Sequence, residues 1–303
     1  MKLLVIGGSG FLSGTLVRDA LAEGHEVWAV TRGNKPLPSG AIPIVADRKD
    51  RGAFARAVGD AGQRWELVVD CIGFTADDAR QDVECFAGRA EQLVFISTDF
   101  VLDPVARPWR VDETYDRFDV RAPYGRQKRE AEVVLLDAAY GATAKTLGIT
   151  ILRPCHIYGP GSQLGCLPLH GRDAQLIDRL RRGEPLKLVG GGHFLQQPVL
   201  AADLAKMAMS CHGNANAAGQ LYLAPGPDVC ASWEYYRIIA DVLGAGLTVE
   251  EVPIATFLAE QPDRHSFCCH RVYAMDKARA HGLAVPATPL RDGLRRHVES
   301  MLV

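Results

Sequence analysis

The sequence predicts an α/β protein with a doubly wound parallel sheet, followed by a smaller and less regular C-terminal region. Three observations lead to this fold. Short apolar segments alternate with helical patterns in the first half of the chain, as successive parallel βα units require. A glycine-rich turn joins the first apolar segment to the first helical pattern. After residue 160 the alternation loosens, and glycines and prolines become frequent.

Each element is predicted from its own pattern. Strands are expected where short apolar runs end at polar residues or glycine, and helices where apolar residues recur three and four positions apart. Pro36, Pro38 and Gly40 predict a loop, and no helix, between the second and third strands. The predicted strands are 2–6, 26–31, 42–45, 67–71, 92–96 and 150–152, and the predicted helices are 11–23, 50–59, 76–87, 124–140 and 171–182.

The turn after the first strand reads Gly7-Gly8-Ser9-Gly10. Its glycines allow a tight turn and a close approach of backbone N–H groups to a pyrophosphate, and the following helix N-terminus adds its positive dipole end. An ordinary glycine turn is the alternative. The strand–turn–helix context favours the nucleotide-binding interpretation, and Ser13 takes the third small position. The first domain is therefore expected to be a Rossmann domain that binds NAD(P).

The end of the second strand bears on the choice of cofactor. NAD-preferring folds usually carry an acidic residue there, whereas this chain has Thr31 and Arg32. Arg32 could pair with a 2′-phosphate, stack on adenine or remain a solvated loop residue. We favour NADP, with NAD as the alternative. Asp47, after the third strand, could accept from the adenine amino group or cap its own loop.

Tyr124 and Lys128 lie four residues apart, on one face of a predicted helix. This spacing is common by chance, but Thr98 ends a strand 26 residues earlier. Together with the glycine turn, the three residues indicate nicotinamide-dependent redox chemistry. Tyr124 would be the acid/base, Thr98 would bind the same substrate oxygen, and Lys128 would hold the nicotinamide ribose and favour the phenolate.

Composition excludes several function classes. The net charge of −2, without long charge blocks, gives no reason to expect a nucleic-acid partner. The apolar run before Gly7 is too short for a signal peptide or a membrane span. Eight cysteines without C-x-x-C favour a reduced, cytoplasmic protein. Cys268, Cys269 and His270 lack zinc spacing, so we expect no metal.

The domain boundary is expected near residue 160, where the pattern changes. We assign residues 1–160 to the NAD(P)-binding domain, to which part of 196–224 returns, and residues 161–303 mostly to a substrate-binding region. Within that region, Ser232 is a candidate N-cap of a helix that extends to about Leu243.

Residues 153–161, Arg-Pro-Cys-His-Ile-Tyr-Gly-Pro-Gly, resemble the R-P-x-x-V-Y-G-P-G signature of the extended short-chain dehydrogenase/reductase family, also called the NAD-dependent epimerase/dehydratase family. With the glycine turn, Thr98, Tyr124 and Lys128, the resemblance covers nearly the whole chain. It implies an NAD(P)-dependent enzyme, often a homodimer paired through the helix that bears Tyr124. The cofactor contacts expected on this resemblance are Gly7, Gly10, Phe11, Leu12, Arg32, Asp47, Cys71, Gly73, Lys128, Pro154 and His156.

The resemblance also narrows the reaction. Ser-Thr-Asp-Phe-Val-Leu-Asp at 97–103 is similar to the S-T-D-Y-V-F-D run of dTDP-4-dehydrorhamnose reductases. Sugar-nucleotide 4,6-dehydratases carry an acid where this chain has Phe100, so dehydration is disfavoured. Carbonyl reduction or alcohol oxidation is expected instead.

The expected substrate is a small, sugar-like molecule. Many nucleotide-sugar enzymes of the family carry an arginine where this chain has Gln196-Gln197, and an amide cannot clamp a diphosphate. Arg271 or Arg153 would have to compensate. Besides Thr98, the candidate substrate contacts are Gln196, His193 and His156, the last being either an auxiliary acid/base or a packed histidine.

The predicted function is an NADP-preferring oxidoreductase that transfers hydride at a hydroxyl or carbonyl group. One alternative is a sugar or sugar-nucleotide epimerase that keeps NAD tightly bound. A second alternative is a non-catalytic or RNA-associated member, because some chloroplast relatives with a similar glycine turn bind RNA. Intact Thr98, Tyr124 and Lys128 argue against the second alternative.

Overall fold

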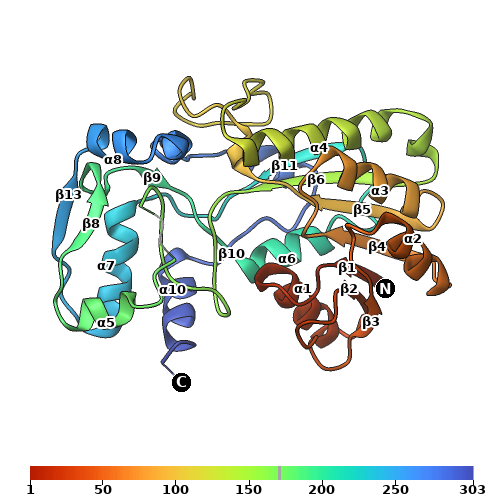
Figure 1. Ribbon diagram of the computed structural model, residues 1–303, viewed down its shortest axis with the longest axis horizontal. Helices are drawn as coiled ribbons and strands as arrows, with labels where there is room; N and C mark the ends of the chain where they lie inside the picture. The colour runs from red at the N-terminus through yellow and green to blue at the C-terminus, as the bar shows by residue number, and fades with distance from the viewer. Residues whose placement is uncertain (170–171, 303) are drawn as a thin grey trace.

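The computed structural model describes residues 1–169 and 172–302. Seven parallel strands form the central sheet, in the order β11-β6-β5-β4-β1-β2-β3 (Figure 1). The chain winds outward in both directions from β1 and β4, whose carboxyl ends form the switch point where such sheets bind ligands. The strands are β1 (Lys2–Ile6), β2 (Glu26–Thr31), β3 (Ile42–Val45), β4 (Trp65–Asp70), β5 (Ala90–Ile96), β6 (Gly148–Pro154) and β11 (Gln220–Ala224).

Helices cover both faces of the sheet. Leu3 and Val5 of β1 pack in one core cluster with Leu16 of the first helix, whereas Leu4 and Ile6 pack in the other, because successive strand residues point to opposite faces. The first face carries α1 (Phe11–Ala22) and α6 (Ala201–Met209), and the second carries α2 (Arg51–Asp60), α3 (Ala76–Phe86) and α4 (Pro123–Tyr140). The predicted doubly wound fold is confirmed.

A smaller region lies at the left in Figure 1, around a third core cluster that includes Tyr158, Tyr235 and Leu294. Strand β8, which pairs with β13 in parallel, packs with α5, α7 and α10, and short pairs β7–β10 and β9–β12 connect this region to the sheet domain. Its elements are β7 (Ile157–Tyr158), α5 (Leu176–Arg181), β8 (Leu186–Val189), β9 (Leu195–Gln196), β10 (Val199–Leu200), β12 (Cys230–Ala231), α7 (Ser232–Leu243), β13 (Val249–Val252), α8 (Ile254–Glu260) and α10 (Leu290–Glu299). Helix α9 (Asp276–Ala280) packs on β11 of the sheet domain, where Ala278 joins the first core cluster.

The structure corrects two local predictions. The helix expected over 171–182 begins at Leu176, since Asp173 caps a turn by accepting from the Gln175 N–H at 2.8 Å; residue 171 lies outside the described residues. Helix α7 has its N-cap at Ala231, not Ser232. Glu234 accepts from the Ala231 N–H at 2.7 Å, while the Ser232 hydroxyl donates to the Phe194 carbonyl at 3.1 Å.

The domain division remains a prediction, although β11 pairs with β6 over residues 220–224, as a return of the chain to the sheet requires. Among the described residues, no helix combines the length and the apolar character needed to cross a membrane.

Candidate active site

The glycine turn between β1 and α1 is built around Gly7, Gly10 and Ser13. Gly7 has a φ of +112°, and a Cβ there would lie 2.7 Å from the Ile72 side chain, so only glycine fits. The Ser13 hydroxyl donates to the Gly7 carbonyl and accepts from the Gly10 N–H, both at 3.0 Å. The turn is thus fixed with its backbone close to the start of α1, where a phosphate would bind.

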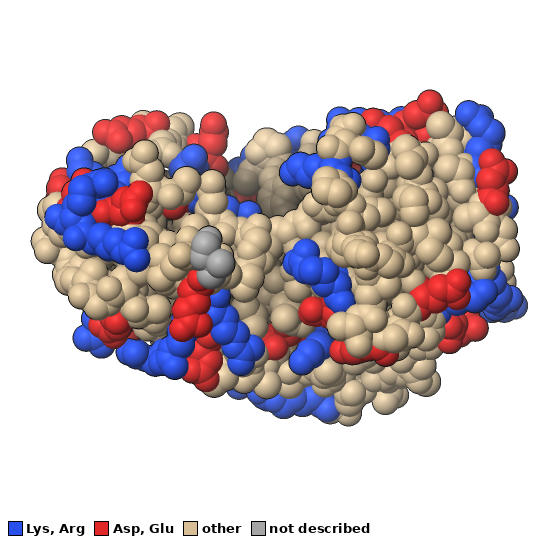
Figure 2. All heavy atoms as spheres, turned by 90° about the horizontal axis from the view of Figure 1, so that it is seen from below, with Lys and Arg blue, Asp and Glu red and all other residues tan. Residues whose placement is uncertain are grey.

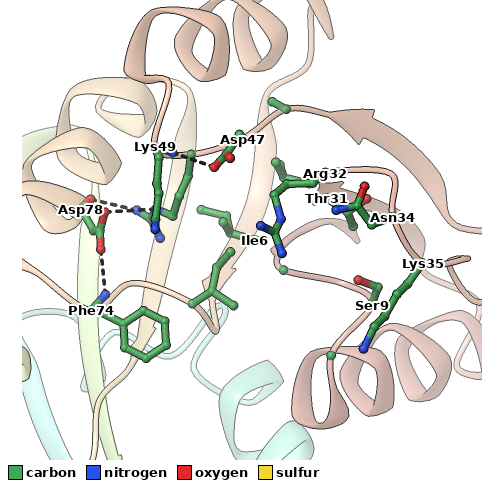
Figure 3. A pocket seen from close by; sticks show the side chains of 16 residues that line it. Ile6, Ser9, Thr31, Arg32, Asn34, Lys35, Asp47, Lys49, Phe74 and Asp78 are labelled. Carbon is green, nitrogen blue, oxygen red and sulfur yellow. Dashed lines mark hydrogen bonds and ion pairs between the residues drawn. The ribbon is translucent and has the colours of Figure 1, made fainter. Parts of the chain in front are cut away.

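A cavity of about 460 Å³ opens over this turn (Figure 3). Gly7, Gly10, Arg32 and Asp47 line it, as expected for cofactor contacts. Lys35, which sequence reasoning missed, lines it as well, and Figure 3 shows its side chain reaching toward Ser9. No carboxylate of residues 1–169 or 172–302 forms an ion pair with Arg32 or Lys35. Two available cations therefore face a cavity beside the glycine turn.

The two roles expected for Asp47, capping its own loop and accepting a hydrogen bond from a ligand, are compatible with each other. One carboxylate oxygen accepts from the Lys49 N–H at 3.0 Å, which caps the loop after β3. The side chain also lines the cavity (Figure 3), so its other oxygen is available to a ligand there.

Beneath the cavity, a buried ion network fixes the ends of β3 and β4. Arg48 donates to Asp70 at 2.6 Å and to Asp82 of α3 at 2.9 Å. Asp70 also accepts from the N–H groups of Ile72 and Gly73 at 2.8 Å. A Cβ on Gly73 would lie 2.2 Å from Asp70. The small residue at position 73 therefore leaves room for this carboxylate, and Gly73 is not among the cavity-lining residues.

A second cavity of about 460 Å³ holds the predicted acid/base. Tyr124, at the start of α4, and Thr98, after β5, both line it, together with Pro154 and His156. Loss of water around the phenol raises the pKa of Tyr124, and its hydrogen bond with Thr98 partly offsets the rise. The structure thus brings together residues that lie far apart in the sequence, at the carboxyl ends of β5 and β6.

Gly125 makes this arrangement possible. The α4 backbone packs so tightly on the turn η1 (Asp99–Val101) that a Cβ at position 125 would lie 2.2 Å from the Phe100 carbonyl oxygen. This contact holds the Tyr124 end of the helix against the segment that carries Thr98.

Lys128 lies deeper than the sequence suggested. Its side chain is 2% exposed, lines neither cavity, and donates to the Ile96 carbonyl at 2.7 Å. The ammonium is 4.9 Å from the ring centre of Phe74 and 4.7 Å from that of Phe95. Burial lowers its pKa to about 8, although Asp70 opposes the change. Its predicted effect on the Tyr124 phenolate stays a prediction.

Several expected contact residues lie away from both cavities. Phe11 and Leu12 are partly buried at the start of α1, and Leu12 packs against the core. Cys71 directly follows β4, and its N–H donates to the carbonyl of Ile6 in the neighbouring strand β1 at 3.2 Å. His193 is exposed. Gln196 is 0% exposed, and its amide has no hydrogen-bond partner within the described residues.

The two arginines that could have replaced a diphosphate clamp serve buried carboxylates instead. Arg271 pairs with Asp99, which also accepts from the Tyr273 hydroxyl at 2.6 Å. Arg153 binds Glu132 with two contacts, at 2.8 and 2.7 Å. Neither arginine lines the Tyr124 cavity.

Two further predictions from the sequence concern the distribution of surface charge and the possibility of a metal site. Basic and acidic side chains are interspersed over the face shown in Figure 2, which is hollowed between the smaller region and the sheet domain. Across residues 1–169 and 172–302, no group of three or more potential ligands is placed to hold a metal ion. His265 instead lies 3.1 Å from Asp119.

A glycine-rich turn at the switch point of a parallel sheet, next to a tyrosine-containing cavity, is typical of dinucleotide-dependent α/β enzymes. The family model for the NAD-dependent epimerase/dehydratase family matches residues 3–222, and the chain belongs to this family. The protein is thus an NAD(P)-dependent oxidoreductase or epimerase of the short-chain dehydrogenase/reductase type, as the resemblance implied.

The relatives of this chain carry names that describe different functions. A 2-alkyl-3-oxoalkanoate reductase of Stenotrophomonas maltophilia is 29% identical over 342 aligned positions, with 98% of each chain covered. The chloroplast stem-loop binding protein of 41 kDa b of Arabidopsis thaliana is 25% identical over 237 positions, covering 73% of this chain and 57% of its own. The structure of UDP-glucose 4-epimerase from Thermus thermophilus with NAD superposes with a TM-score of 0.76 at 20% identity, covering 100% of this chain and 99% of the other, which supports the fold.

Proposed function

We propose that the protein is an NADP-preferring reductase that acts on the carbonyl group of a small, sugar-like molecule, with Tyr124 as the acid. One observation carries the proposal. Thr98 and Tyr124 line one cavity, and the glycine turn with Arg32 and Lys35 lines another, both at the carboxyl ends of strands in the same sheet.

In this proposal, bound NADPH supplies the hydride that goes to the carbonyl carbon. Tyr124 gives its phenolic proton to the carbonyl oxygen, so that the product is an alcohol and the proton is later regained from solvent. The Thr98 hydroxyl donates to the same oxygen and orients the carbonyl group. The reverse reaction, alcohol oxidation, uses the same groups in the opposite direction.

The preference for NADP rests on two cations. Arg32 and Lys35 line the dinucleotide cavity, and their side chains would hold a 2′-phosphate by charge-assisted hydrogen bonds. Replacing both by glutamine is expected to weaken NADPH binding at least tenfold, since each such bond contributes about 1.5–3 kcal/mol. NADH serves as the matched ligand, and its affinity is expected to stay within about twofold. An equal loss for both cofactors would refute the assignment.

The substrate is proposed to lack a nucleoside diphosphate. Arg153 and Arg271 are held by buried carboxylates, so neither is free to clamp a diphosphate in the Tyr124 cavity, and Arg172 is the arginine among its lining residues. Phe100 and Phe267 form an apolar wall that suits a sugar ring or an alkyl chain. The relative named as an oxoalkanoate reductase makes oxo acids the second substrate class to assay, beside free keto-sugars.

The first experiment denatures the purified protein and identifies any released nucleotide by mass spectrometry, while NADPH and NADH are titrated into the native protein. An empty protein that prefers NADPH supports a reductase that releases its cofactor. Stoichiometric retained NAD⁺ would support the epimerase instead. Binding of neither cofactor would refute the proposal.

The role of Tyr124 is tested once a substrate is found among the keto-sugars and oxo acids. Tyr124→Phe removes the proton donor and is expected to lower kcat by about 10²–10⁴-fold. Tyr140→Phe is the matched control, because Tyr140 ends the same helix and its hydroxyl donates to the Gly219 carbonyl. An unchanged rate in Tyr124→Phe would end the catalytic assignment.

The stem-loop binding relative makes RNA association the second candidate. We propose no nucleic-acid partner, on the strength of the mixed charges in Figure 2 and the net charge of −2. Salt-dependent retention of RNA on the purified protein would overturn this view.

We further propose a homodimer in the cytoplasm. Helix α4 would pair with its copy through an exposed face that includes Val133, and all eight cysteines are free, as in reducing compartments. Light scattering of the purified protein tests the dimer, and fractionation of the source cells tests the location.

A further inference from the structure

Phe74 occupies a distinctive place between the two cavities. It follows β4 and lines the dinucleotide cavity, where its side chain is 45% exposed (Figure 3). Its ring centre is 4.9 Å from the Lys128 ammonium and 6.3 Å from the ring centre of Tyr124. One aromatic side chain therefore contacts both residues of the predicted tyrosine–lysine pair.

The two cavities have no lining residue in common among the residues that the structure describes. Phe74 borders the one that contains the glycine turn, and Tyr124 borders the other. A dinucleotide that reaches from the turn to Tyr124 would come close to Phe74, which lines the first cavity and whose ring lies beside that of Tyr124. Lys128 is covered on this path, between Phe74 and the core residue Phe95, which is fully buried.

The backbone on either side of Phe74 is fixed. The N–H groups of Phe74 and Thr75 both donate to the Asp78 carboxylate, at 2.9 and 3.1 Å, and the Thr75 hydroxyl accepts from the Asp78 N–H at 3.2 Å. Gly73, just before, is packed against Asp70 and Phe95. The ring can therefore leave Lys128 by side-chain rotation, which is fast for an exposed residue, whereas the chain that carries it stays in place.

We propose that Phe74 is an aromatic gate to the nicotinamide subsite: its ring covers Lys128 in the free enzyme and rotates away when the nicotinamide half of the cofactor binds. Phe74 is thus a positioning residue, since the uncovered Lys128 becomes available to the cofactor. The inference rests on the proposed dinucleotide binding. The adenosine half, which binds at the other end of the cavity beside Arg32 and Lys35, does not require the ring to move.

The test compares two ligands on the wild-type protein and Phe74→Ala by isothermal titration calorimetry. NADPH needs the gate to open, whereas 2′,5′-ADP contains only the adenosine half with its 2′-phosphate. Removing the ring removes a cation–π contact to the buried Lys128 ammonium that binding must break, so the Kd for NADPH is expected to fall by about two- to thirtyfold. The Kd for 2′,5′-ADP is expected to stay unchanged.

Two outcomes would overturn the gate. Weaker NADPH binding with unchanged 2′,5′-ADP binding would mean that the ring packs on the bound nicotinamide. Unchanged binding of both ligands would mean that it does not obstruct the path. Failure of the wild-type protein to bind either ligand would reject the proposed function itself, and the gate with it.

A second variant keeps the test independent of the stability of Phe74→Ala. Phe74→Trp places a fluorescent ring at the gate, read as the difference from wild type because the chain has four other tryptophans. NADPH is expected to shift the emission of the added indole, and 2′,5′-ADP is expected to leave it unchanged. Equal responses to the two ligands would contradict the proposal.

Discussion

Gly125 offers a sharp test of how helix α4 positions the site. In Gly125→Ala, the new Cβ would lie 2.2 Å from the Phe100 carbonyl oxygen. The contact would have to open by about 0.8 Å (3.0 minus 2.2) to reach the distance below which real Cβ contacts are essentially never found. Because the obstacle is backbone, the helix or the turn at Thr98 must move.

The expected stability change combines two opposing effects. Alanine in place of glycine favours a helix by about 0.5–1 kcal/mol, whereas overpacking costs about 1–3 kcal/mol. The matched control is Gly59→Ala in α2, where residue 59 is exposed and the nearest atom is the end of the Arg89 side chain, 3.6 Å away. The control should gain about 0.5–1 kcal/mol, so the two variants should differ by about 1–3 kcal/mol.

The assay has two parts. Urea unfolding gives the free energy of unfolding for both variants, and kcat/KM gives the effect on the site. A shift approaching 1 Å between Tyr124 and Thr98 is expected to lower kcat/KM by about 10²-fold in Gly125→Ala and to spare Gly59→Ala. A Gly125→Ala protein as stable and as active as the control would refute the reasoning from close packing.

Three further changes have defined outcomes. Since burial lowers the pKa of Lys128 to about 8, the ammonium loses its proton as pH rises through 8, so titration calorimetry should show weaker NADPH binding at about pH 9 than at about pH 7, and this dependence should vanish in Lys128→Met. Arg48→Met leaves Asp70 and Asp82 buried without their cation, so urea unfolding should show a loss of about 3–5 kcal/mol. The loss should shrink as pH falls, because the two carboxyls would then have raised pKa values and take up protons more readily in the folded state; a deficit independent of pH would contradict this. Gln196→Met removes a buried amide without partners among the described residues and should increase the free energy of unfolding by about 1–3 kcal/mol. A rise in KM in this variant would instead support the substrate contact that the sequence predicts for Gln196.

Most of the sheet domain was predictable because most of its elements carry a local pattern, whereas strand β11 and helix α6 were not among the predicted elements. The continuous apolar run of β1 and the glycine turn before α1 depend on neighbours in the sequence. The short strands β7, β8, β9, β10, β12 and β13 were missed, since two to four residues have no periodicity to detect. Their pairing depends on contacts across the smaller region.

The residues of the candidate site were likewise predictable where they follow a local sequence pattern, and not where they depend on contacts across the fold. Thr98, Tyr124 and the turn at Gly7 were predicted from spacing and end at cavity walls. The burial of Lys128 under Phe74 was not predictable, because it depends on a side chain from another strand end. Lys35 could have been predicted as a cofactor contact from the sequence, because it follows Arg32 by three residues in the same loop. No sequence pattern predicts the buried, unpaired amide of Gln196, because its burial depends on the whole fold.

The position of β11 at the sheet edge has a consequence for synthesis on the ribosome. Strand β6 ends at residue 154, and β11, which completes its hydrogen bonding, begins 66 residues later, at residue 220. At roughly 5–20 residues per second, the open edge of β6 waits for roughly 3–13 seconds before its partner is made. An open edge of this kind invites pairing with other chains, so the nascent protein passes through an interval in which it needs protection from its neighbours.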